Sequence, residues 1–195
     1  MSDVVLACER LTRRFGGLTA VHGVTLEWRL DEIHAVIGTN GAGKSTLINM
    51  LSGEIPASEG RIVLRGDDVT RWSQPRRARA GIGRSYQRTT IFPEFSVSEN
   101  CRLAAQSRTP HAMRVFHRAE GYAEVNRRAE EAMEAAGLTH RSGRVAATLS
   151  HGEQRQLEIA MCLATQPRVL LLDEPLAGMG PHESQRMVEL IKKLT

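Results

Sequence analysis

Long apolar runs, aromatic residues and cysteines are all scarce in this sequence of 195 residues. The longest apolar run, at 169–172, is far shorter than the ~20 residues of a membrane-spanning helix. The N-terminus lacks the basic start and apolar stretch of a secretion signal. Aromatic residues make up only 4%, which disfavours a surface that stacks single-stranded nucleic acid. Three widely spaced cysteines, Cys8, Cys101 and Cys162, argue against a disulfide framework and indicate a reducing compartment.

The composition that remains is that of a mildly basic globular protein. Hydrophobic residues make up 41% and the mean hydropathy is -0.29, so the chain can bury a core. Lys and Arg number 26 against 22 Asp and Glu, which gives a net charge of +4. Such a balance suits a nucleotide, a nucleic acid or an anionic membrane face, and is too small to choose among them.

Apolar alternation and glycine boundaries predict the strands and helices of an α/β protein. We expect strands at 3–9, 22–30, 33–37, 60–66, 82–87 and 169–172, and helices at 44–52, at 75–81 and from Pro181 to the end of the chain.

The middle of the chain, residues 96–165, differs in composition from both ends. It is rich in Ala, Glu and Arg with helical periodicity, and capping boxes at Ser96 and Ser150 predict two helix starts. We therefore expect a single domain with an α/β core of residues 1–90 and 161–195 and a helical sub-domain of residues 91–160.

A phosphate-binding pattern follows the strand expected at 33–37. The residues GTNGAGKS match G-x-x-x-x-G-K-[ST] between a strand and a helix, as that motif requires. Glycines let backbone N–H groups surround phosphate oxygens at a helix N-terminus. Lys44 supplies a cation to the β- and γ-phosphates, and Ser45 offers a hydroxyl to Mg²⁺. The candidate binding residues are Gly38, Asn40, Gly41, Ala42, Gly43, Lys44, Ser45 and Thr46.

Two carboxylates end the apolar strand expected at 169–172. Asp173 can hold a Mg²⁺-bound water or the Ser45 hydroxyl, and Glu174 is placed to polarise an attacking water. By itself this pattern is also typical of a surface carboxylate pair. Together with the phosphate loop it indicates nucleotide hydrolysis.

The stretch LSHGEQR at 149–155 resembles the signature motif of the ATP-binding subunits of ABC transporters, and the resemblance covers essentially the whole chain. It implies a P-loop NTPase (RecA-like) core with an N-terminal antiparallel β sub-domain and an inserted α-helical sub-domain. It also implies that Ser150 and Gly152 contact the γ-phosphate of ATP held by a second subunit. The same residues form a capping box, and both roles are compatible.

Further roles follow from the resemblance alone. Gln87 matches the Q-loop glutamine, which contacts Mg²⁺ or the attacking water and joins Glu174 and Lys44 as a catalytic residue. Phe15 matches the aromatic ring that stacks on adenine, with Val21 as an apolar neighbour, although a single ring near the N-terminus is more often a core residue. The loop at 91–100 matches the segment that faces the membrane partner, although an ordinary hinge would read the same way.

The sequence departs from the family pattern in four respects. His151 stands where glycine is usual, Glu153 where glutamine is common, and Gly180 where Asp or Asn is usual. The histidine that contacts the γ-phosphate, expected after one more strand, is missing, and His182 lies too early to replace it. We therefore expect a chain shortened at its C-terminus.

Several segments together resemble the ATPases of bacterial branched-chain (hydrophobic) amino-acid importers: RFGGLTAV at 14–21, RSYQ at 84–87 with IFP at 91–93, LSHGE at 149–153 and DEPLAGM at 173–179. This resemblance implies an ATPase that uses ATP and Mg²⁺ and energises integral membrane permease subunits for branched-chain amino acids or related small amides. It implies a second ATP-binding subunit, in a homo- or heterodimer, and indirectly an extracytoplasmic solute-binding protein. The expected location is peripheral, at the cytoplasmic face of the bacterial inner membrane.

Two other functions remain open at this stage. One is a nucleotide-binding module without turnover because of the shortening, and the other is a soluble ABC ATPase that acts on nucleic acid, which we do not expect. A basic stretch faces either anionic lipid or RNA, or simply solvent; its members are Arg71, Arg76, Arg77, Arg79, Arg84 and Arg88.

Overall fold

The computed structural model describes residues 3–86, 90–108 and 122–194. These residues form two compact units, one ending at Ile82 and the other running from Gly83 to Leu194. Strands and helices succeed one another as expected for an α/β protein. The domain boundaries expected from the sequence stay a prediction.

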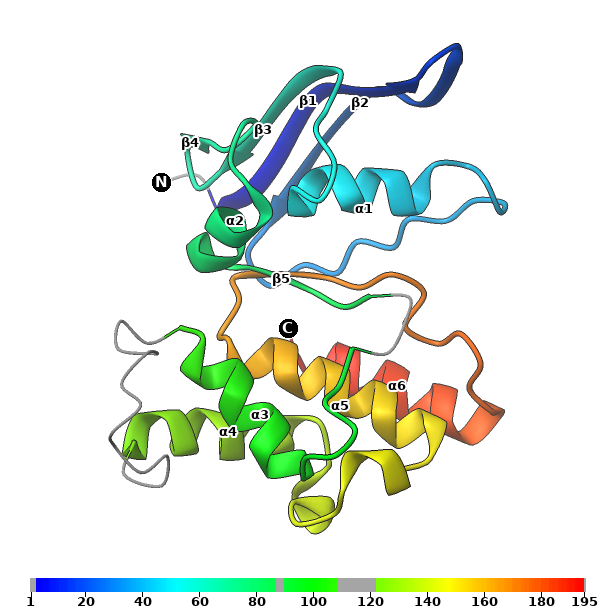
Figure 1. The fold of residues 1–195 in the computed structure, drawn as a ribbon. Helices are drawn as coiled ribbons and strands as arrows, with labels where there is room; N and C mark the ends of the chain where they lie inside the picture. The colour runs from blue at the N-terminus through cyan, green and yellow to red at the C-terminus, as the bar shows by residue number, and fades with distance from the viewer. Residues whose placement is uncertain (1–2, 87–89, 109–121, 195) are drawn as a thin grey trace. The chain divides into compact units, whose positions relative to one another are not determined.

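An antiparallel sheet dominates the first unit (Figure 1). The strands are β1 (Val4–Phe15), β2 (Leu18–Arg29), β3 (Glu59–Leu64) and β4 (Asp67–Asp68), in the order β2-β1-β3-β4 with antiparallel pairing throughout. Along β1, Leu6 and Cys8 alternate with more exposed neighbours and are fully buried. Leu11 of the same strand and Ile62 of β3 are also fully buried. This confirms the N-terminal antiparallel β sub-domain.

Two helices complete the first unit, α1 (Lys44–Ser52) and α2 (Gln74–Ala80), and α1 contacts both β2 and α2. The guanidinium of Arg77 on α2 is buried and donates to carbonyls at the end of α1. The proposal that Arg77 belongs to a solvated or ligand-facing basic surface is therefore wrong. The reason is that Arg77 lies on the face of α2 turned toward α1, where carbonyls of the last helical turn accept from its guanidinium.

The strand expected at 33–37 is also not found. Ile33, Val36 and Ile37 are exposed, with 92% of Ile37 accessible to solvent. An apolar run predicts burial, but a strand exists only where a neighbour supplies ladder hydrogen bonds. Among the described residues, no strand pairs with this segment.

The second unit combines a two-stranded sheet, β5 (Ile82–Arg84) with β6 (Val169–Leu171), and four helices. These are α3 (Val97–Gln106), α4 (Ala123–Ala135), α5 (His151–Ala164) and α6 (Pro181–Lys192), with 3₁₀ turns at Thr139–Arg141 and Ala146–Thr148. The sequence overestimates the length of β5 and of α6. Both capping boxes are confirmed, because Ser96 accepts from the Glu99 N–H and Ser150 from the Glu153 N–H.

A core of helix-borne side chains holds the second unit together. Val97 and Cys101 of α3 meet Met133 of α4, Leu157 of α5 and Met187 of α6. Burial raises the pKa of the Cys101 thiol to about 12. All three cysteines are free, as expected.

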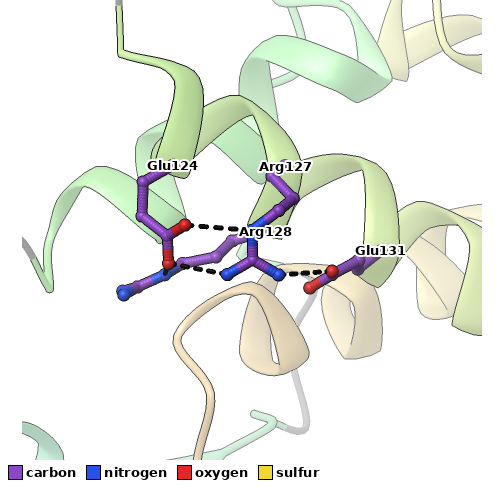
Figure 2. Close-up of polar contacts among 4 residues, drawn as sticks. All are labelled: Glu124, Arg127, Arg128 and Glu131. Carbon is purple, nitrogen blue, oxygen red and sulfur yellow. Dashed lines mark hydrogen bonds and ion pairs between the residues drawn. The ribbon is translucent and has the colours of Figure 1, made fainter.

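The outer face of α4 carries a network of ion pairs (Figure 2). Arg127 bridges Glu124 at 2.7 Å and Glu131 at 2.5 Å, and Arg128 also binds Glu124 at 2.7 Å. Hydrogen bonds from the two guanidinium groups lower the pKa of Glu124 to about 2.

In the part of the chain that the structure describes, no helix has the length and apolar character needed to cross a membrane.

Candidate functional site

The glycine-rich loop forms an exposed turn that leads directly into α1. The Lys44 side chain folds back over this turn and donates from Nζ to the carbonyls of Gly38 at 2.8 Å and Thr39 at 2.9 Å. Because the helix is capped by Gly43, no side chain of the capping residue covers its first N–H groups. The result is a cation and a helix N-terminus presented together, which is the arrangement that binds phosphate.

Gly43 is required by its surroundings as well as by its backbone. Its φ of 89° lies in the left-handed region. A Cβ atom there would overlap the Ala20 carbonyl oxygen and approach the Val21 side chain to 3.2 Å. The loop is therefore seated against β2 at Val21, one of the residues predicted to contact the nucleotide. Ser45 and Thr46 follow in the first turn of α1 and are partly exposed.

Phe15 lies at the end of β1 and pairs with Leu18 across the hairpin. The residue is 44% exposed, and the Arg13 guanidinium lies 4.5 Å from the ring centroid. The alternative that Phe15 is a core residue is therefore wrong, because the hairpin extends past the end of the packed sheet. An exposed ring is free to stack, and its role with adenine stays a prediction.

The two predicted carboxylates follow β6 in the second unit and differ in environment. Asp173 is only 5% exposed, and its N–H donates to Ser85 Oγ at 3.4 Å. Glu174 is exposed and has a φ of 48°, in the left-handed region that non-glycine residues rarely adopt. Such a conformation costs about 1–3 kcal/mol and is typical of functional sites.

The signature residues form the N-terminus of α5. The Ser150 N–H donates to Glu153 at 2.9 Å and lowers the pKa of that carboxyl, with a further contribution from Arg141. Glu153 therefore completes the capping box and binds Arg141, which explains one departure from the family pattern. The ring of His151, another departure, lies near Gly178 in the loop after Glu174, where an added Cβ atom would come 3.1 Å from it.

A cavity of about 550 Å³ opens at this helix terminus, bounded also by α6 and the end of α4. The Glu183 carboxylate lies within 3.5 Å of Ser150 Oγ. A Cβ atom at Gly152 would come 2.5 Å from Glu183 Oε1. An acidic group of the chain itself thus occupies the surface at which the resemblance places a phosphate.

Gln87 lies outside the described residues. The sequence interpretation overlooked a charged pair on α5, Arg155 and Glu158, which are buried and bound to each other at 2.7 Å. A signal was present, since the two opposite charges are three positions apart and therefore lie on the same face of the helix.

The comparisons with known proteins agree with these motifs. A family model described as "ABC transporter" matches residues 21–177. The chain belongs to the ABC transporter family. The match includes the phosphate loop, the residues of α5 and the carboxylates after β6.

Curated ABC relatives resemble the chain over its full length. It is 40% identical over 201 residues to the high-affinity branched-chain amino acid transport ATP-binding protein LivG of Salmonella typhimurium, covering 100% of this chain and 78% of that protein. It is 41% identical over 202 residues to the corresponding protein BraF of Pseudomonas aeruginosa, with the same coverage of both chains.

Solved ABC structures confirm the expected fold class. An ATP-binding cassette in its ADP conformation matches with a TM-score of 0.85 and 29% identity, covering 98% of this chain and 76% of that one. A nucleotide-free cassette matches with a TM-score of 0.84 and 28% identity, covering 98% and 77%. Cassettes of this family bind ATP, and in transporters they work with membrane permease components.

Proposed function

We propose that this chain binds and hydrolyses Mg²⁺-ATP and energises a permease that imports branched-chain amino acids or related small amides. The observation that carries the ATPase proposal is the phosphate loop, in which Lys44 Nζ lies over the loop carbonyls at the start of α1. The cargo is inferred from the names of the relatives, LivG and BraF.

Individual side chains have defined roles in this proposal. Lys44 and the loop N–H groups bind the phosphates and stabilise negative charge during transfer. Glu174 accepts a hydrogen bond from the attacking water and orients it, as does Gln87. Phe15 stacks on adenine beside Val21.

The residues proposed for Mg²⁺ suit that ion chemically. Ser45 and Asp173 offer hard oxygen ligands, and Gln87 offers an amide oxygen. Mg²⁺ keeps several waters and binds substrate phosphates, so it needs few protein ligands. Among the described residues, no cluster of three or more His, Cys, Asp or Glu side chains could bind a metal. When bound, the ion would neutralise charge on the β- and γ-phosphates.

A second subunit completes the proposed site. Ser150 and Gly152, at the positive end of α5, would bind the γ-phosphate held by that subunit. Gly152 suits this role because it adds no side chain to this helix end, and the Glu183 carboxylate would have to move away for a phosphate to bind there.

The permease contact is proposed at two exposed aromatic rings, Phe92 and Phe95. Their centroids lie 5.7 Å apart with an interplanar angle of 25°. Buried Asn100 fixes the loop by accepting from the Phe92 N–H at 2.8 Å and donating to the Phe92 and Ser96 carbonyls. A rigid apolar projection of this kind suits a hydrophobic cleft on a protein partner. Such a contact would hold the chain at the cytoplasmic face of the inner membrane.

Binding and turnover of Mg²⁺-ATP by the purified chain test the proposal. We expect Glu174→Gln to retain binding and to lower kcat at least 100-fold, and Lys44→Ala to weaken binding. Glu131→Gln, on the exposed face of α4, is the control and should behave like the wild type. Binding without turnover in both the wild type and Glu174→Gln would indicate a non-hydrolysing module. Absence of binding would refute the proposal.

A further inference from the structure

Two oppositely charged residues of α5, Arg155 and Glu158, form a buried ion pair. Arg155 Nη1 lies 2.7 Å from Glu158 Oε2, and the two residues are only 8% and 4% exposed. Buried ion pairs often stabilise a fold no better than apolar side chains of similar size. Stability alone therefore does not account for this pair.

The pair also contacts Tyr86 and Thr90, which lie on the two sides of residues 87–89. Arg155 Nη1 donates to the Tyr86 carbonyl at 2.9 Å. Glu158 Oε1 accepts from the Thr90 N–H at 2.6 Å and from the Thr90 hydroxyl at 3.4 Å. One helix thus holds the residue before this short segment and the residue after it.

The first of these flanks is also tied to β6 and α5. The Ser85 N–H donates to the Leu171 carbonyl at 3.0 Å, two residues before Asp173. The thiol of Cys162, on α5, donates to the Arg84 carbonyl at 3.0 Å. The approach to Gln87 is therefore fixed to the strand that leads to Asp173.

We propose that Arg155 and Glu158 are positioning residues for ATP hydrolysis, because they anchor both flanks of the segment that carries Gln87 to the helix that begins at Ser150. The inference rests on the proposed function. In this role the pair keeps Tyr86 and Thr90, on the two sides of the Gln87 segment, bound to α5. A shift of about 1 Å at a catalytic group can lower a rate about 100-fold, so the anchors matter for catalysis.

A charge swap separates this role from a purely structural one. In the variant R155E/E158R the two charges still attract each other. However, a carboxylate now faces the Tyr86 carbonyl, and a guanidinium faces the Thr90 N–H. A structural ion pair would tolerate the swap, whereas the two backbone anchors would be lost.

The experiment measures steady-state ATP hydrolysis and amide hydrogen exchange on the full chain. We expect R155E/E158R to lower kcat about 10- to 100-fold and to change KM for ATP less than threefold. Exchange at the Thr90 amide should accelerate about tenfold. The matched control is R127E/E131R, the same swap in the exposed pair of α4, which should leave both quantities unchanged.

Two further variants preserve the test if the swap prevents folding. R155K/E158Q keeps a donor for Tyr86 and an acceptor for Thr90, and should retain kcat within about fivefold. R155M/E158L removes both anchors in an apolar pair and should remain folded with lowered kcat. Denaturation curves establish that each variant is folded.

Equal kcat values for folded R155M/E158L and the wild type would overturn the proposal, as would unchanged exchange at Thr90. Failure of the proposed function looks different, because wild-type turnover would then equal that of Glu174→Gln. The hydrolytic role of the pair would fail with it, while exchange at Thr90 would still decide whether the anchors exist.

Discussion

Replacing Arg77 by methionine should destabilise the first unit severely. The Arg77 guanidinium is 2% exposed and donates to four backbone carbonyls. Two of them end α1, those of Met50 at 2.6 Å and Leu51 at 2.9 Å. The other two belong to Thr70 at 2.9 Å and Trp72 at 3.2 Å. Methionine keeps the aliphatic stem and leaves all four acceptors without this donor.

The magnitude follows from these contacts. A hydrogen bond to a charged group contributes about 1.5–3 kcal/mol, so four would contribute about 6–12 kcal/mol. Burying the guanidinium opposes this by several kcal/mol, and the same burial lowers the pKa of Arg77. We therefore expect Arg77→Met to lower the free energy of unfolding by about 3–5 kcal/mol. Arg77→Lys, which keeps a charge and fewer donors, should cost about 1–3 kcal/mol.

Urea denaturation followed by circular dichroism measures both changes. The matched control is Arg76→Met, because Arg76 is exposed and stacks on Trp72 at 3.8 Å; it should cost no more than about 1 kcal/mol. A free energy of unfolding for Arg77→Met within about 1 kcal/mol of the wild-type value would show that the four contacts do not stabilise the protein.

Three further predictions concern the loop, the strained carboxylate and the acid response. Gly43→Ala should lower the free energy of unfolding by about 2–4 kcal/mol, because of its left-handed φ and the overlap with β2. Gly41 also has a left-handed φ but faces open space, so Gly41→Ala should cost only about 1 kcal/mol. Similar denaturation midpoints for the two variants would contradict this. Glu174→Asn should leave the free energy of unfolding unchanged or raise it by about 1 kcal/mol, because Asn tolerates a φ of 48°, while turnover is lost. A lower free energy of unfolding would show that the backbone at Glu174 is not strained. Glu124 has its pKa lowered to about 2 from the usual 4.5, so its stabilising effect is complete above pH 4.5 and is lost as the pH falls towards 2. The difference in Tm between the wild type and Glu124→Gln should therefore shrink over that range at low salt, and a difference that is constant with pH would argue against the α4 network.

Local signals predicted most elements of the fold. The helix at 44–52 has the predicted bounds, and both capping boxes form as expected, because a cap joins residues only three positions apart. The strand at 33–37 was predicted wrongly for the opposite reason. Its apolar pattern is local, but strand pairing depends on distant neighbours, which no local pattern contains.

The candidate site shows the same division. The loop that ends in Lys44 was identified from its spacing, since phosphate binding needs glycines and a cation at fixed positions in one turn. The exposure of Phe15 could not be read from the sequence, because it depends on where the hairpin leaves the packed sheet.

The sequence by itself determined the family, the phosphate loop and the order of the helices, because each depends on residues close together in the chain. Only the tertiary structure decided that Arg77 caps the end of α1 and that Arg155 and Glu158 hold the flanks of 87–89. These contacts join residues 26 to 69 positions apart. A charged side chain looks the same in a sequence whether it meets solvent or a buried carbonyl, and packing alone makes that choice.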